Sequence, residues 1–96
     1  MQNTTKEIIT KGGVKIVYNT SITYGQHNEI KAIYLGKKEN ETDGDMILRA
    51  DRRGIEIVVV SIDGDKENIY DRFSNLDYVD VKPVMEIVKD ILDPKV

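Results

Sequence analysis

The sequence MILRADRRGIEIVVVSI, residues 46–62, contains the most hydrophobic segment of the chain, Ile55–Ile62. Apolar side chains fall on both faces of this segment when it is extended, because strand side chains alternate. A strand that is apolar on both faces is typically central in a sheet. Asp51 and Gly54 bound a connection with the composition of a type I turn followed by a residue with positive φ. The stretch therefore predicts a β-hairpin over Met46–Ile62.

Three further strands are predicted N-terminal to this hairpin. Lys6–Lys11 and Val14–Tyr24 flank the pair Gly12-Gly13, which is typical of a tight hairpin link. Val14–Tyr24 carries apolar or aromatic side chains at every second position for most of its length, as expected for a half-buried strand. Glu29–Leu35 is apolar on both faces and is predicted to lie inside the sheet.

The period of the apolar residues changes after residue 64. Val81–Leu92 carries an apolar stripe at helical spacing, which predicts an amphipathic helix with Asp80 as its cap and Pro83 in its first turn. A shorter helix is predicted near residues 66–74, and a strand over Asn68–Phe73 is the alternative. The C-terminal helix needs a sheet to pack against, because its valines and isoleucines are mediocre helix formers.

Together these elements predict an α+β fold, since the strands come first and the helices follow. We expect an antiparallel β-meander of four to six strands, the C-terminal amphipathic helix packed on one face, and one short extra helix near residues 66–74. The chain of 96 residues has the length of a single domain, and we expect residues 1–5 to be frayed.

The composition argues against an enzyme. The chain has no cysteine and a single histidine, His27, which falls in a predicted turn. Thiolate metal sites and the common catalytic triads are therefore absent or incomplete. No phosphate-binding glycine motif or G-x-S-x-G motif occurs, so no cofactor and no metal is expected. The N-terminal residues lack the apolar core of a signal peptide, and no run is long enough for a membrane span, so we expect a cytoplasmic protein that does not contact a membrane.

Charge is distributed unevenly along the chain. The net charge is -3, yet residues 1–40 carry six Lys against three Glu, and acidic residues dominate from residue 41 onward. An acidic surface can steer association with a basic partner. We therefore expect a small non-catalytic protein that acts by protein–protein interaction, in the manner of an inhibitor, an immunity protein or an adaptor. The candidate partner-binding residues are Asp63, Asp65, Glu67, Asp71, Asp77 and Asp80.

A module that binds single-stranded nucleic acid is the alternative. Basic loops beside a sheet that bears tyrosines could hold phosphates and stack bases. The candidate residues for this function are Lys37, Lys38, Arg49, Arg52, Arg53 and Tyr34. The acidic total and the absence of tryptophan argue against it.

Two weaker possibilities concern metal ions and self-association. The acidic pairs of Asp43-Gly44-Asp45 and Asp63-Gly64-Asp65 could ligate a divalent cation, although Asp-Gly is first of all a turn signal. The strand predicted at Lys6–Lys11 would lie at a sheet edge, so the protein is expected to be a monomer or a homodimer through that edge.

Overall fold

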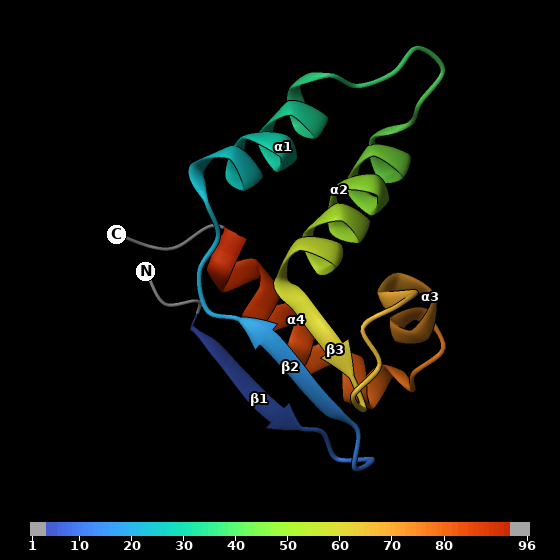
Figure 1. Ribbon diagram of the computed structural model, residues 1–96. Coiled ribbons are helices and arrows are strands. Elements are labelled where there is room, and N and C mark those ends of the chain that lie inside the picture. The colour runs from blue at the N-terminus through green and yellow to red at the C-terminus, as the bar shows by residue number, and fades with distance from the viewer. Residues whose placement is uncertain (1–3, 93–96) are drawn as a thin grey trace.

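The computed structural model describes residues 4–92 and shows an α+β fold with three strands and four helices (Figure 1). The sheet has the order β1-β2-β3 and is antiparallel throughout. The elements in chain order are β1 (Thr5–Ile9), β2 (Lys15–Asn19), α1 (Tyr24–Leu35), α2 (Asp43–Val58), β3 (Val59–Ile62), α3 (Ile69–Ser74) and α4 (Tyr78–Leu92). The prediction of α+β with an antiparallel sheet is confirmed, whereas the prediction of four to six strands is wrong.

The β1–β2 hairpin follows the sequence-based prediction closely. The Gly12-Gly13 pair lies at its turn, and Gly13 has a φ of +82°, a conformation that glycine adopts at little cost. The Thr10 N–H donates to the carbonyl of Val14 at 2.9 Å across the turn. β1 begins at Thr5, inside the segment predicted to be frayed, and residues 1–3 of that segment lie outside the described residues.

One face of the sheet carries the hydrophobic core. Ile8 is paired with Ile16 and Ile16 with Ile62, so the three side chains share a face. Figure 1 shows α4 running behind the sheet, and Val84 and Val88 of α4 belong to the same buried cluster. The C-terminal helix therefore packs on one sheet face, as predicted.

The predicted Met46–Ile62 hairpin is wrong, because residues 46–58 belong to α2 and only Val59–Ile62 forms a strand. The Asp51-to-Gly54 segment lies inside the helix and makes no turn. Buried α2 residues Ala50, Gly54, Ile57 and Val58 recur at helical spacing, so the helical period prevails over the alternation of the apolar run.

The predicted strand over Glu29–Leu35 is also wrong, since these residues form the second half of α1. A capping box fixes the start of α1: the Gln26 N–H donates to Thr23 Oγ1 at 3.1 Å, and the Thr23 N–H donates to the Gln26 side chain at 2.9 Å. The predicted strand over Val14–Tyr24 is correspondingly shorter and ends at Asn19. Figure 1 shows α1 and α2 packed side by side above the sheet.

The two C-terminal helices were predicted with partly wrong boundaries. The short helix near residues 66–74 is confirmed as α3, and the strand alternative is wrong. α4 begins at Tyr78, so Asp80 is not its cap and Pro83 lies beyond its first turn. Within residues 4–92, no helix is both long enough and apolar enough to cross a membrane.

Candidate functional site

The six carboxylates predicted to bind a partner have two different roles in the structure. Three of them are engaged within the protein. Asp63 Oδ1 accepts the backbone N–H of Lys15 at 2.9 Å, which joins the turn after β3 to β2. Asp65 forms an ion pair with Arg72 on α3. Asp80 is only 5% exposed, and its carboxylate holds the β1–β2 turn. These three groups stabilise the fold and are not available to a partner in the way that the sequence suggested.

The other three predicted carboxylates remain exposed. Glu67 lies in the loop after β3, Asp71 lies on α3, and Asp77 immediately precedes α4. None of their side chains forms an ion pair with any residue between 4 and 92. Those of the predicted carboxylates that remain exposed therefore lie around α3 and the start of α4.

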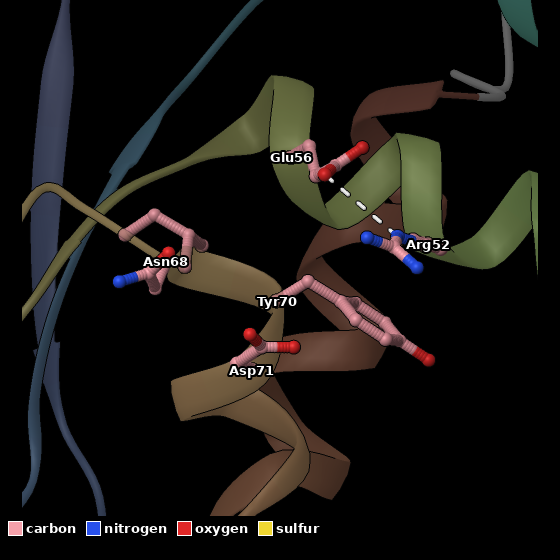
Figure 2. A pocket seen from close by; sticks show the side chains of 6 residues that line it. Arg52, Glu56, Asn68, Tyr70 and Asp71 are labelled. Carbon is pink, nitrogen blue, oxygen red and sulfur yellow. Dashed lines mark ion pairs between the residues drawn. The ribbon is translucent and has the colours of Figure 1, made fainter.

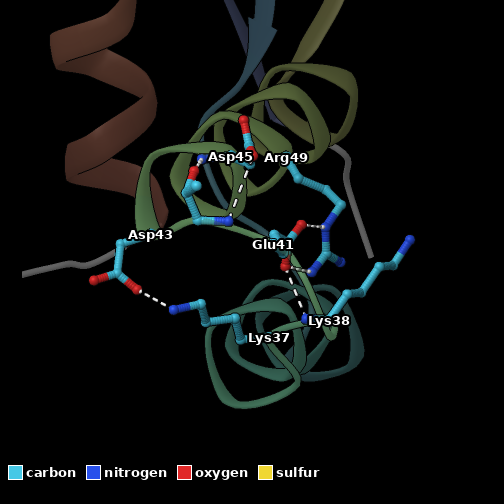
Figure 3. A network of polar contacts seen from close by, with 7 residues as sticks. Lys37, Lys38, Glu41, Asp43, Asp45 and Arg49 are labelled. Atoms are coloured by element: carbon cyan, nitrogen blue, oxygen red, sulfur yellow. Dashed lines mark hydrogen bonds and ion pairs between the residues drawn. The ribbon is translucent and has the colours of Figure 1, made fainter.

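The basic residues predicted to bind nucleic acid are mostly neutralised within the loop between α1 and α2 and its neighbours. Glu41 receives two hydrogen bonds from the Arg49 guanidinium, at 3.0 and 2.9 Å, and a third from the Lys38 N–H at 2.9 Å (Figure 3). These bonds, with that from Arg49 the strongest, lower the pKa of Glu41 to about 2. Lys37 Nζ lies 2.7 Å from Asp43 Oδ1. In the part of the chain described, only the ammonium group of Lys38 lacks an ion pair in this network.

The remaining basic candidates are engaged as well. Arg53 Nε lies 2.7 Å from a Glu29 carboxylate oxygen, and this hydrogen bond raises the pKa of Arg53. Arg52 lies 3.8 Å from Glu56. Tyr34 is on α1 and not on the sheet, so the predicted stacking platform on the sheet does not include it. The structure does not bring the six residues into one open basic strip.

The acidic pairs considered for a cation are explained by local structure. Asp45 completes the capping box of α2, in which its N–H donates to Thr42 Oγ1 at 3.1 Å. Asp63 has a φ of +51° and forms a turn with Gly64. Between residues 4 and 92, no three His, Asp or Glu side chains are placed to hold a metal ion together.

An apolar hollow, which we call the helical groove, lies between α2, α3 and α4. Its volume is about 390 Å³, and all three helices contribute to its walls. Nine of its ten lining residues are apolar, aromatic or a small serine, and one is a carboxylate. They are Leu48, Asp51, Ile55, Tyr70, Phe73, Ser74, Leu76, Tyr78, Val81 and Met85.

Helical periodicity positions the walls of the helical groove. Leu48, Asp51 and Ile55 recur at i, i+3 and i+7 on α2, so they project from one face of that helix. Tyr78 and Met85 are related by the same seven-residue spacing on α4. The short α3 covers part of the seam between these faces, and Phe73 of α3 is buried at its base.

The rim of the helical groove carries exposed apolar side chains. Leu48 is 63% exposed and Tyr78 is 76% exposed. Ile47 and Val79, the adjacent residues on α2 and α4, are also exposed. Both α2 and α4 thus contribute exposed apolar side chains to the hollow or beside it.

Asp51 is the charged group inside the helical groove. Partial burial raises the pKa of Asp51, and the positive charge of Lys89 on α4 offsets part of this effect. Its carboxylate makes no ion pair or hydrogen bond within residues 4–92. A cationic group brought to this position by a partner would therefore meet a carboxylate that is partly removed from water.

A smaller polar hollow adjoins the helical groove at Tyr70 (Figure 2). It has a volume of about 340 Å³ and lies between α2 and α3. The Arg52 guanidinium carbon lies 4.9 Å from the centre of the Tyr70 ring, a cation–π contact that closes the seam between the two helices. Asp71 lines this hollow, so an exposed carboxylate lies one residue from the ring that the two hollows share.

A third hollow, of about 630 Å³, lies between α1, α2 and α4. Its charged lining residues include two lysines, Lys31 and Lys89, and two aspartates, Asp51 and Asp90. His27 also lines it, and belongs to α1 instead of the predicted turn. Asp51 therefore lines both this hollow and the helical groove.

Sequence reasoning missed the helical groove because it placed Leu48 and Ile55 on strands. The seven-residue spacing of these two side chains, together with the Thr42–Asp45 capping box, was the signal that could have found one wall. Comparisons with protein-family models, with curated proteins and with solved structures find no match to this chain.

Proposed function

We propose that this protein is a non-catalytic binding module that acts by occupying a partner protein, and that the helical groove is its contact surface. The observation that carries the proposal is the exposed apolar rim of the groove, where Leu48 and Tyr78 are 63% and 76% exposed. Apolar side chains gathered at the edge of a hollow are characteristic of protein interaction sites, whereas apolar side chains scattered singly over a surface are normal.

The chemistry of the groove supports binding more than catalysis. It contains one carboxylate, one serine and two tyrosines, and no histidine or lysine that could serve with them as an acid–base pair. Tyrosine is enriched among the residues that dominate the energy of protein interfaces, because its ring is large and its hydroxyl can remain hydrated. Tyr78 at the rim and Tyr70 at the seam suit this role.

The charges favour a protein partner over nucleic acid. Phosphate contacts dominate nucleic-acid affinity and require available Lys and Arg side chains. Arg49, Arg52 and Arg53 are each held by a carboxylate of the same chain, at 2.9, 3.8 and 2.7 Å respectively. Binding a phosphate through them would require breaking these pairs.

The proposal is tested by affinity capture from the native host's lysate with three forms of the protein. The wild type is compared with the double variant Leu48→Ser, Tyr78→Ser and with the control Leu35→Ser. Leu35 is a matched control because it is 79% exposed but lies at the end of α1, outside the groove. Circular dichroism verifies that all three retain their helical content.

We expect one stoichiometric protein to be captured by the wild type and by Leu35→Ser, and to be lost with the double variant. Nuclease treatment should leave this result unchanged. Equal capture by the double variant would contradict the groove as the contact surface, and capture that disappears with nuclease would favour nucleic acid.

A further inference from the structure

We infer that the helical groove receives an amphipathic α-helix that carries Lys or Arg beside its apolar stripe. This inference rests on the proposed function and adds the conformation and the charge of the bound segment. Three features of the groove lead to it: the absence of backbone partners along its walls, the openness of its rim, and the excess of carboxylates around it.

The walls of the groove favour a helix over an extended peptide. All ten lining residues contribute to the hollow from helices or from the short connection between α3 and α4, and none comes from a strand. An extended peptide obtains its affinity from backbone hydrogen bonds to a sheet edge, which this groove does not offer. A helix satisfies its own backbone groups and needs only apolar contacts, which the groove does supply.

The open rim favours a macromolecular partner over a small molecule. Pockets for small ligands typically enclose about 70–90% of the ligand surface. The most exposed of the large apolar lining residues, Leu48 and Tyr78, leave the hollow open to solvent. A helix laid along α2 and α4 would cover both side chains at once, which a ligand confined to the hollow would not.

The charges around the groove favour a basic helix. Asp51 lies within the groove, Asp71 lies beside Tyr70, and Asp77 lies beside Tyr78. None of the three carboxylates forms an ion pair within residues 4–92. The nearby positive charges are weaker competitors, because Arg52 is engaged with Glu56. Lys82, which follows Val81 on α4, and Lys89, whose charge acts on the Asp51 carboxyl, are exposed and form no ion pair within residues 4–92. The three unpaired carboxylates therefore outnumber these unpaired lysines by one.

The test uses two synthetic helical peptides of roughly 16 residues, a length at which a peptide can hold a helix. Both carry leucine at i, i+3, i+4 and i+7, and they differ only in having Lys or Glu beside the leucine stripe. Binding of each to the ¹⁵N-labelled protein is followed by amide chemical shifts at low and moderate salt. The variants are Leu48→Ser and the double variant Asp71→Asn, Asp77→Asn.

We expect the Lys peptide to bind about tenfold more tightly than the Glu peptide at low salt, since several exposed charge pairs each contribute a small factor. Its shift changes should centre on α2, α3 and α4 around Leu48, Tyr70 and Tyr78. Leu48→Ser should weaken both peptides, whereas Asp71→Asn with Asp77→Asn should remove most of the preference for Lys and leave the Glu peptide unchanged.

Three results would overturn the inference. They are no binding of either peptide, equal binding of both, and shift changes that centre on β1 or on the α1–α2 loop. The proposed function fails separately, when the lysate partner binds the Leu48→Ser, Tyr78→Ser variant as well as the wild type. A partner that needs the groove but competes with neither peptide would therefore support the function and contradict the basic helix.

Discussion

The helical groove and the loop that joins α1 to α2 differ in how far their side chains are already engaged within the protein. At the loop, Arg49 of α2 makes two hydrogen bonds to Glu41, and Lys37 pairs with Asp43 at the start of α2 (Figure 3). In and around the groove, Leu48 and Tyr78 are exposed, and the carboxylates of Asp51, Asp71 and Asp77 form no ion pair within residues 4–92.

This difference shows that charge composition alone is a poor guide to a binding site. A charged side chain whose hydrogen bonds are satisfied within the chain must lose them before it can bind anything else. An exposed apolar side chain has no hydrogen bond to lose, and covering it is favourable because apolar surface is removed from water. Association with a partner should therefore cost less free energy at the helical groove than at the loop between α1 and α2.

The largest expected effect is on the free energy of unfolding, and it distinguishes a buried core residue from an exposed residue of the groove. Ile16 is fully buried between the sheet and the helices, so Ile16→Ala should lower the free energy of unfolding by about 2–5 kcal/mol. Leu48→Ala should change it by less than about 1 kcal/mol, because this side chain is largely exposed. Urea denaturation followed by far-UV circular dichroism measures both. If Leu48→Ala lowered the free energy of unfolding as much as Ile16→Ala, Leu48 would be a core residue.

The second effect on the free energy of unfolding distinguishes Asp80 from Asp77, two residues that were both predicted to bind a partner. The Gly12 N–H donates to Asp80 Oδ1 at 2.7 Å, and Asp80 is buried (Figure 1 shows the β1–β2 turn close to α4). Asp80→Ala should cost about 1–3 kcal/mol, because it leaves the N–H without a partner.

The matched control for that variant is Asp77→Ala. Asp77 is exposed and its side chain makes no hydrogen bond within residues 4–92, so we expect a change within about 0.5 kcal/mol in the same urea titration. If Asp80→Ala and Asp77→Ala lowered the free energy of unfolding equally, Asp80 would not have the structural role that distinguishes it from Asp77.

A smaller effect is expected at the seam between α2 and α3. Arg52→Gln removes the contact with the Tyr70 ring and the pair with Glu56, and should cost about 0.5–1 kcal/mol, the range for an exposed cation–π contact. Arg52→Lys retains the charge and should recover part of this loss. Identical stability of Arg52→Gln and the wild type would show that the cation–π contact contributes nothing measurable.

The most local effect is on the pKa of Glu41 in the loop between α1 and α2. Arg49→Gln should raise the pKa of Glu41 from about 2 toward its ordinary value of 4.5. Since the folded-state pKa is the lower one, the stability that this pair contributes is present above the ordinary value and is lost as the pH falls through about 2. Titration of the Glu41 side-chain carboxyl by ¹³C NMR measures the shift. An unchanged pKa in the variant would contradict the bidentate pair.

The sequence was sufficient for the elements whose local signals agree with their tertiary environment. β1, the Gly12-Gly13 turn and the C-terminal helix were predicted because turn chemistry and periodicity both point the same way. The strand Val59–Ile62 was found within a larger region that was otherwise assigned wrongly.

The error over α2 has a physical origin in Gly54 and the apolar run that follows it. A glycine in mid-helix is unfavourable by about 1 kcal/mol relative to alanine, so its presence suggested a turn. In the structure, a Cβ on Gly54 would come within 2.6 Å of Leu92 Cδ1, so the glycine permits a close approach between α2 and α4. No local sequence pattern reveals a contact between residues so far apart in the chain.

The candidate site was predictable only in part for the same reason. The class of function and the exposed carboxylates Asp71 and Asp77 could be suggested from composition, and that class stays a prediction. The helical groove could not be predicted, since its walls come from three helices, one of which had been assigned to strands.

Whether the helical groove contacts a partner protein is tested by photo-cross-linking in the native host's cells. A photo-reactive phenylalanine analogue is placed at Leu48 and, separately, at Leu35, and the cells are irradiated. Both positions are exposed, but Leu48 lines the groove and Leu35 lies at the loop end of α1. We expect one cross-linked partner protein from position 48 and none from position 35. Cross-linking of the same partner from position 35 alone would contradict this expectation.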